Sequence, residues 1–330
     1  MPAHRTDLFE SGLSMDAEPT IVLNTPALDR SWLASLNNHV REHKMVAIGL
    51  LLAVLGVLVL LVQSITQVFV GDAPEGLRLA LYGGAAGFAA TALGALPALL
   101  LRGLPQRIED SMLGFAAGMM LAASAFSLLL PGLEAGEALL GNRGTGAAVV
   151  VLGMALGVLL MLGLDEFTPH EHDKTGPCGP GHEICGRVWL FVFAIALHNL
   201  PEGMAIGVSF SQGDWSVGLP LTTAIALQDI PEGLAVALAL RSAGVAPSHA
   251  VLIAAASGVL EPVGALLGVG LAGGLALAYP IGLGLAAGAM IFVVSHEVIP
   301  ETHRNGHQTS ATLGLMAGFA LMMVLDTTLG

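Results

Sequence analysis

Charged residues are scarce in this chain, and several motifs are absent from it. Only 11% of its 330 residues are charged, against about 25% in a soluble domain. The 12 Lys and Arg residues are scattered singly, which disfavours nucleic-acid binding. The two cysteines, Cys178 and Cys185, share one loop, so no disulfide framework is implied. There is no Walker A motif, and no loop between apolar segments exceeds about twenty residues, so ATP-driven transport is disfavoured.

Apolar residues dominate what is present. They make up 54% of the chain, and the mean hydropathy is +0.77. Long apolar segments of this kind are typical of membrane helices, because unpaired backbone cannot face lipid. The predicted fold class is therefore all-α, a polytopic transmembrane helix bundle of about nine spans. The predicted spans are Met45–Val70, 77–101, 111–134, 145–166, 187–211, 217–240, 249–275, 280–302 and 310–329.

The basic residues predict how the chain is oriented. If the N-terminus is cytoplasmic, ten Lys and Arg residues lie in inner loops and only Arg78 and Arg143 lie outside. This bias places the N-terminus inside and the C-terminus outside. Residues 1–44 are then a cytoplasmic tail, in which 27–43 form either a short interfacial helix or a disordered segment. Residues 45–70 are an additional N-terminal transmembrane helix, and residues 77–330 are the main domain.

Two related hexapeptides place ionisable side chains inside predicted spans. The first, at 198–203, is His-Asn-Leu-Pro-Glu-Gly, and the second, at 228–233, is Gln-Asp-Ile-Pro-Glu-Gly. We call them the motif pair. Each ionisable residue in a membrane costs about 2.5–3.5 kcal/mol on insertion scales, so a functional role is the default interpretation. Residues three and four apart share a helix face, so His198 and Asn199 can act with Glu202, and Gln228 and Asp229 with Glu232.

The side-chain chemistry of the motif pair indicates divalent metal binding. Each proline frees the carbonyl four residues earlier, which membrane helices tolerate beside a polar cavity. Imidazole, carboxylate and amide ligands without a thiolate favour Zn²⁺, Fe²⁺, Mn²⁺ or Cd²⁺ and disfavour Cu⁺. No Lys or Arg lies deep in any predicted span to pair with the carboxylates. Two glutamates that can bridge suggest room for two ions.

Further polar residues extend from this site toward both ends of the bundle. Glu261 lies within the span 249–275, and Asp326 near the outer end of the last span can attract cations. Met120 and Ser127 are weaker candidates for lining the path. The loop 167–186 is either a flexible cytoplasmic tether that binds metal loosely or a solvated linker with incidental histidines. The predicted exit path or secondary metal site comprises Asp165, Glu166, His170, His172, His182, His296 and Glu297.

Several Gly-x-x-x-Gly patterns predict close helix packing in lipid rather than chemistry. They lie at 83/87, 114/118, 153/157, 203/207, 264/268, 284/288 and 314/318. Such packing implies a compact bundle that can bring several helices to one site.

The motif pair and the histidine-bearing loop before it resemble those of the ZIP (Zrt/Irt-like) metal transporters, in particular bacterial members. The resemblance covers roughly residues 77–330. It implies divalent metal uptake across a bacterial inner membrane into the cytoplasm, a binuclear site, a homodimer and an elevator-like motion. One metal would be held by His198, Glu202 and Glu232, with Met120 nearby. The second would be held by Asn199, Glu202, Gln228, Asp229, Glu232 and Glu261.

Two departures from the family pattern stand out. The segment Met45–Val70 precedes the usual eight spans, and Gln228-Asp229 stands where many eukaryotic members carry a histidine. The alternative function is an intramembrane metal-dependent hydrolase, with a metal sensor as a third interpretation. Because H-E-x-x-H is absent and polar ligands continue toward the cytoplasmic mouth, we expect a transporter and not an enzyme, with metal ions as substrate and no catalytic cofactor. The residues do not rank Zn²⁺ against Fe²⁺, Mn²⁺ or Cd²⁺, and they leave proton coupling open.

Overall fold

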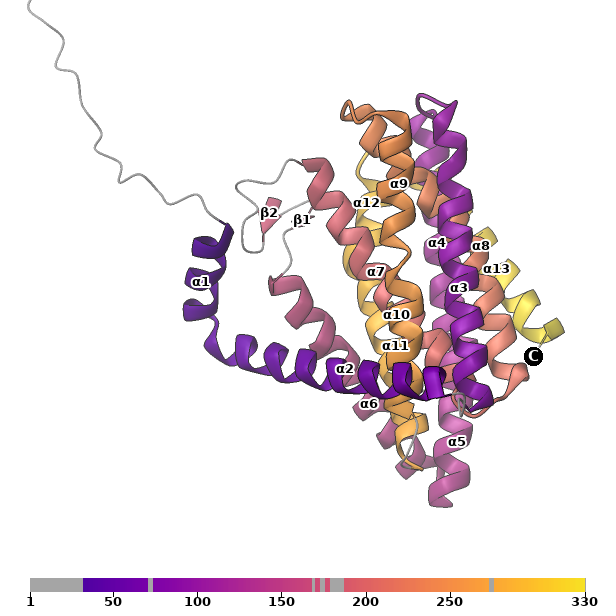
Figure 1. Cartoon of the computed structure of the whole chain (residues 1–330). Coiled ribbons are helices and arrows are strands. Elements are labelled where there is room, and N and C mark those ends of the chain that lie inside the picture. The colour runs from indigo at the N-terminus through magenta and orange to yellow at the C-terminus, as the bar shows by residue number, and fades with distance from the viewer. Residues whose placement is uncertain are drawn as a thin grey trace, which may run out of the picture.

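The structure is a computed structural model that describes residues 32–70, 74–167, 170–172, 176–178, 187–272 and 276–329. Its elements follow one another as a series of long helices (Figure 1). They are α1 (Trp32–Glu42), α2 (Lys44–Val70), α3 (Glu75–Ala95), the 3-10 turn η1 (Leu96–Leu99), α4 (Gln106–Ala123), the π-helix η2 (Ser124–Leu129), α5 (Leu130–Leu140), α6 (Arg143–Phe167), β1 (His170–His172), β2 (Gly176–Cys178), α7 (Arg187–Phe210), α8 (Trp215–Ser242), α9 (Pro247–Ser257), α10 (Leu260–Ala272), α11 (Ala278–Val293), the π-helix η4 (Val294–Val298), α12 (Ile299–His303) and α13 (Gln308–Leu329).

The predicted helical membrane bundle is confirmed in its general form. Seven helical segments are long and apolar enough to cross a membrane, the longest being Gln106–Leu140 with 35 residues. The count of nine is not confirmed, because α2 and α7 are not among these seven. Helix α7 packs inside the bundle against α10, α3 and α8. Helix α2 contacts α10 and α3, and Figure 1 shows it running across them rather than along them.

The N-terminal region and the histidine-bearing loop show more local order than their composition required. Residues 32–42 form the helix α1, as one of the two interpretations of 27–43 predicted. In the loop, β1 and β2 pair antiparallel, with His170 opposite Cys178. This small hairpin is an exception to the all-α expectation. His182 lies outside the described residues, as does the tail 1–31.

Glycine pairs hold three helix pairs in close contact, as the spacing predicted. On α6 and α11, a Cβ at Gly157 would overlap the Leu285 carbonyl, and one at Gly288 would overlap the Met154 carbonyl. The same reciprocal arrangement joins α4 to α13 through Gly114, Gly118, Gly314 and Gly318, and α7 to α10 through Gly203, Gly207, Gly264 and Gly268. Small residues therefore let these backbones touch, which stabilises helix packing where lipid offers no hydrophobic driving force.

Two π-helical turns, η2 and η4, precede prolines. Pro131 follows η2 and Pro300 follows η4. A proline lacks the N–H that would bond the carbonyl four residues earlier, here Ser127 and His296, and its ring crowds that turn. The widened turns re-aim the side chains they carry, and such π-bulges are frequent at functional sites.

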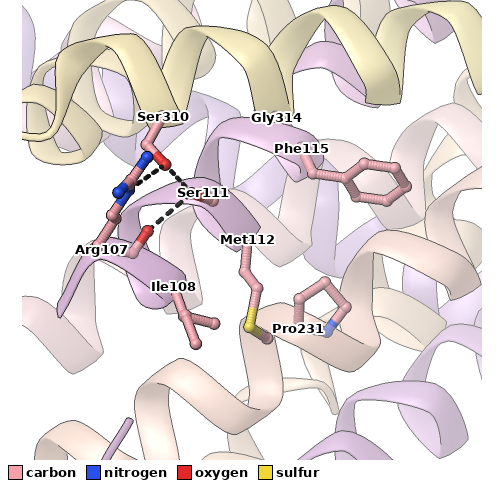
Figure 2. Close-up of a pocket in the computed structure, with 8 residues that line it drawn as sticks. All are labelled: Arg107, Ile108, Ser111, Met112, Phe115, Pro231, Ser310 and Gly314. Carbon is pink, nitrogen blue, oxygen red and sulfur yellow. Dashed lines mark hydrogen bonds between the residues drawn. The ribbon is translucent and has the colours of Figure 1, made fainter. Parts of the chain in front are cut away.

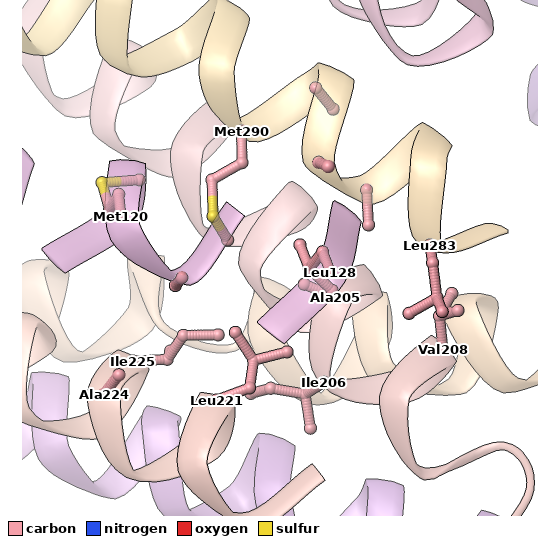
Figure 3. Packing of buried hydrophobic residues seen from close by; sticks show 14 of the residues in the cluster. Met120, Leu128, Ala205, Ile206, Val208, Leu221, Ala224, Ile225, Leu283 and Met290 are labelled. Carbon is pink, nitrogen blue, oxygen red and sulfur yellow. The ribbon is translucent and has the colours of Figure 1, made fainter. Parts of the chain in front are cut away.

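The main apolar core is built from side chains of many helices, chiefly α4, α7, α8 and α11. Figure 3 shows part of it, where Met120 and Leu128 lie among side chains from α7, α8 and α11. The labelled members of this cluster are Met120, Leu128, Ala205, Ile206, Val208, Leu221, Ala224, Ile225, Leu283 and Met290.

Candidate metal site

Helices α7 and α8 bring the motif pair together in the interior. The two helices are neighbours along the chain, joined by residues 211–214. Gln228 Nε2 donates a hydrogen bond of 2.6 Å to Glu202 Oε1. Oxygen atoms of Glu202, Asp229 and Glu232 lie within 4.8 Å of one another. The side chains of the motif pair's ligand candidates are all buried: His198, Asn199, Glu202, Gln228, Asp229 and Glu232.

Buried oxygen atoms in this group lack hydrogen-bond partners. They are Glu202 Oε2, Gln228 Oε1, Asp229 Oδ2 and Glu232 Oε1, and Glu261 Oε2 joins them from α10. Within the described ranges, no Lys or Arg side chain is buried. An unpaired buried acceptor costs about 1–3 kcal/mol, and a charged one costs more. Five such oxygens in one place need cations, metal ions or protons, to balance them.

Glu261 reaches the site because α9 and α10 are interrupted. The helix breaks at residues 258–259, and Glu261 stands in the first turn of α10. The positive end of the helix dipole favours an acid there, and broken helices are a recurrent way to place ion ligands at membrane depth. Pro262, which follows, has no N–H to continue the upstream ladder. The Glu261 side chain is fully buried.

Thr91 of α3 is a residue of this site that sequence reasoning missed. Its hydroxyl donates a hydrogen bond of 2.9 Å to Glu261 Oε1. Four residues earlier, a Cβ at Gly87 would overlap Glu261 Oε2 and lie 3.2 Å from Asp229 Oδ2. The only signal in the sequence is the Gly87–Thr91 spacing, which puts both residues on one face of α3.

The glycines of the motif pair admit the helices that complete the site. A Cβ at Gly203 would overlap the Glu261 carbonyl, and one at Gly233 would overlap the Thr91 carbonyl. Each glycine follows a motif glutamate directly. The motif therefore combines a ligand with the space that lets a second ligand-bearing helix approach.

Met120 does not join the polar group in the same way. It is 1% exposed and belongs to the apolar cluster with Met290 and Ile225 (Figure 3). Its role as a metal ligand stays a prediction.

A second group lies where α6 and α11–α12 come together. Ligand atoms of Asp165, His296 and Glu297 lie within 4.8 Å of one another. His296 Nε2 is 4.0 Å from Asp165 Oδ2, and the ring stacks on Phe292. Both His296 and Glu297 come from the π-helix η4. The structure thus brings together three of the predicted exit residues. The side chains of His170 and His172 lie outside the described part. Glu166 lies near His39 and His43 instead.

Asp326 of α13 and Ser127 of η2 are joined. Ser127 Oγ donates a hydrogen bond of 2.7 Å to Asp326 Oδ1. Sequence reasoning named both residues separately, and only the packing of α13 on η2 pairs them.

A pocket between α4, α8 and α13 lies beside the second hexapeptide (Figure 2). Its polar side chains bond one another, since Arg107 Nε donates to Ser310 Oγ at 3.1 Å and the Ser111 and Ser310 hydroxyls are 2.8 Å apart. Pro231 forms part of its wall. Because these groups satisfy each other and the other walls are apolar, we assign no metal to this pocket.

The helical bundle and its buried oxygen ligands define an integral membrane protein suited to holding cations inside the bilayer. A family profile described as ZIP Zinc transporter matches residues 169–326. Zinc transporter ZIPB of Bordetella bronchiseptica is 65% identical over 290 residues, covering 88% of this chain and 94% of that protein. Zinc transporter GufA of Myxococcus xanthus is 44% identical over 243 residues, covering 73% of this chain and 95% of that protein. Zinc transporter ZupT of Stenotrophomonas maltophilia strain R551-3 is 35% identical over 261 residues, covering 76% of this chain and 96% of that protein.

The chain belongs to the ZIP family. This confirms the resemblance carried by the motif pair. The family consists of transporters rather than enzymes, so the alternative of an intramembrane hydrolase is not supported.

Proposed function

We propose that this protein carries divalent transition-metal ions, Zn²⁺ foremost, across the bacterial inner membrane into the cytoplasm. The relatives are named zinc transporters, which favours Zn²⁺. The imidazole, carboxylate and amide ligands also suit Cd²⁺, Fe²⁺ and Mn²⁺. The observation that carries the proposal is the group of five buried oxygens without partners.

The motif pair forms a binuclear site in this proposal. His198, Glu202 and Glu232 hold one ion, with Met120 next to it. Asn199, Gln228, Asp229 and Glu261 complete the second, sharing Glu202 and Glu232. Oxygen atoms of three of these acids lie within 4.8 Å of one another, a spacing that supports shared ligands. Thr91 orients Glu261 through its hydrogen bond, as outer-shell partners commonly do for metal ligands.

The ions follow a path through the bundle. Asp326, held by Ser127, attracts cations at the outer end. Asp165, His296 and Glu297 receive them at the cytoplasmic end, with His170, His172 and His182 of the loop beyond. All ligands of the binuclear site except Met120 stand on α7, α8 and α10. Helix α7 packs against both α8 and α10, and all three pack against α3, which supports movement of the site as one body. The N-terminus is cytoplasmic, the C-terminus is outside, and the working form is a homodimer.

Metal flux into sealed proteoliposomes tests the proposal. Purified protein is reconstituted with an internal Zn²⁺- and Cd²⁺-sensitive dye, and Glu232→Ala is compared with wild type at several pH gradients. The matched control is Glu75→Ala, an exposed acid at the start of α3. Saturable flux should vanish in Glu232→Ala and persist in Glu75→Ala.

Normal flux in a folded Glu232→Ala variant would refute the binuclear site as the conducting site. Absence of flux from wild-type protein that binds metal would refute transport itself. A response of the flux to the pH gradient indicates proton exchange at the buried carboxylates.

A further inference from the structure

A cluster of potential metal ligands lies where α1 meets the end of α6. It is separate from the motif pair and from the exit group, which consists of Asp165, His296 and Glu297. His39 and Glu42 stand on α1, and His43 follows directly. The backbone N–H of His43 donates to the His39 carbonyl at 2.9 Å, so helical spacing continues across the junction. His39 and His43 therefore share one face, four residues apart. Opposite them stands Glu166, on the last turn of α6.

Two distances in this cluster match those between neighbouring ligands of a tetrahedral metal site. His39 Nε2 is 3.2 Å and His43 Nε2 is 3.3 Å from the same oxygen, Glu166 Oε1. Zinc bonds of 2.0–2.1 Å at tetrahedral angles place neighbouring ligand atoms about 3.3 Å apart. Glu42 is a further ligand candidate on the histidine side, since ligand atoms of His39, Glu42 and His43 lie within 4.8 Å of one another.

Direct ion pairing does not satisfy this arrangement. His39 Nε2 is buried and makes no hydrogen bond, although Glu166 Oε1 lies 3.2 Å away. The two imidazole rings lie 4.6 Å apart, tilted by 31°. Two imidazolium cations at this distance would repel each other. A cation between two neutral rings and one carboxylate resolves both difficulties.

The surroundings hold the cluster in place. The Phe167 ring packs edge-on against His39 with centroids 5.0 Å apart. Val40, Lys44 and Ile48 border an apolar pocket with Phe167 beside the histidines. These apolar groups border one side of the cluster, and a hydrophobic surrounding influences solvent access and the local dielectric at a metal site.

We propose that His39, His43 and Glu166, with Glu42, bind a divalent first-row cation, Zn²⁺ in the first instance, separately from the transport path. The bound ion links α1 to α6 beside Asp165, the residue before Glu166 and a member of the exit group. The sequence signal is His-x-x-Glu-His at 39–43, a spacing that metal-binding helices use. This site does not depend on the proposed transport.

Metal stoichiometry of the full-length protein in detergent tests the site. Wild type, the His39→Ala/His43→Ala variant and Glu166→Gln are dialysed against buffered Zn²⁺, and bound zinc is counted by mass spectrometry. The control is His249→Ala, an exposed histidine on α9. Each cluster variant should bind one Zn²⁺ fewer per chain than wild type and His249→Ala. Equal stoichiometry in all four proteins would overturn the proposal.

Tryptic cleavage gives a second readout that does not depend on counting ions. Arg41 is exposed on α1 between the two histidines, and Lys44 is exposed at the start of α2. Zn²⁺ should slow cleavage after Arg41 in wild type by tenfold or more and leave the double-histidine variant unchanged. Equal protection in that variant would overturn the proposal. Because neither assay needs a membrane gradient, a failure of metal flux in proteoliposomes refutes the transport proposal alone.

Discussion

Replacing Gly203 with alanine is expected to push α7 away from α10 and move Glu261 out of the metal site. A Cβ at Gly203 would lie 2.8 Å from the Cα and carbonyl carbon of Glu261 and closer still to its oxygen. Ordinary Cβ contacts begin at 3.4 Å, so the backbones must separate by at least about 0.6 Å (3.4 minus 2.8), and by more to clear the carbonyl oxygen. Metal–ligand distances tolerate only about 0.2 Å. The second ion of the motif pair should therefore bind more weakly.

The same overlap should lower stability. Overpacking of a tight interface costs about 1–3 kcal/mol. The matched control is Gly163→Ala on α6, where a Cβ meets nothing within 4 Å. There the substitution should stabilise the helix by about 0.5–1 kcal/mol, because alanine loses less backbone entropy.

Thermal unfolding in detergent and competitive Zn²⁺ titration measure the two effects. Gly203→Ala should unfold several degrees below wild type and lose affinity for one of its two motif-pair ions by about tenfold or more. Gly163→Ala should do neither. A Gly203→Ala protein with wild-type melting and full zinc affinity would refute the close α7–α10 contact as the feature that positions Glu261.

Two further substitutions address partners that only the fold supplies. Thr91→Val removes the donor to Glu261 Oε1 and should weaken zinc binding about 10–100-fold in the same titration. The control is Thr223→Val, which should leave zinc binding unchanged because the Thr223 hydroxyl donates to the Leu219 carbonyl of its own helix. An equal effect of both variants would contradict the role of Thr91. Ser127→Ala removes the hydrogen bond to Asp326 and should lower Zn²⁺ uptake into vesicles several-fold at limiting Zn²⁺ but little at saturating Zn²⁺. The control is Ser257→Ala. An equal loss of uptake at both Zn²⁺ concentrations would argue against cation capture by Ser127 and Asp326.

The sequence predicted most helix boundaries within a few residues, and the ZIP family that the motif pair indicated is confirmed. The metal ligands of the motif pair stay a prediction. The Gly-x-x-x-Gly spacing also predicted close packing, since a four-residue period keeps both glycines on one helix face. It did not indicate which helices would pair. That choice depends on matching two such faces, as Gly203 and Gly264 do across α7 and α10.

Met45–Val70 shows a limit of hydropathy. Its length and composition predicted a span, and the helix formed over nearly those residues. Its direction across α10 and α3 (Figure 1) depends on contacts that composition does not encode. The span therefore stays a prediction.

Local chemistry and period are written in the sequence, because a hexapeptide carries its own ligands, its proline and its glycine. The way in which residues far apart in the chain come together is not apparent from the sequence. Thr91 and Glu261 are 170 positions apart, and His39 and Glu166 are also far apart in the chain. The sequence alone determined a helical membrane bundle with the polar side chains of the motif pair at its centre. Only the tertiary structure decided that α3 and α10 complete that centre and that α1 forms a second cluster with α6, because these contacts follow from how glycine faces and helix ends pack.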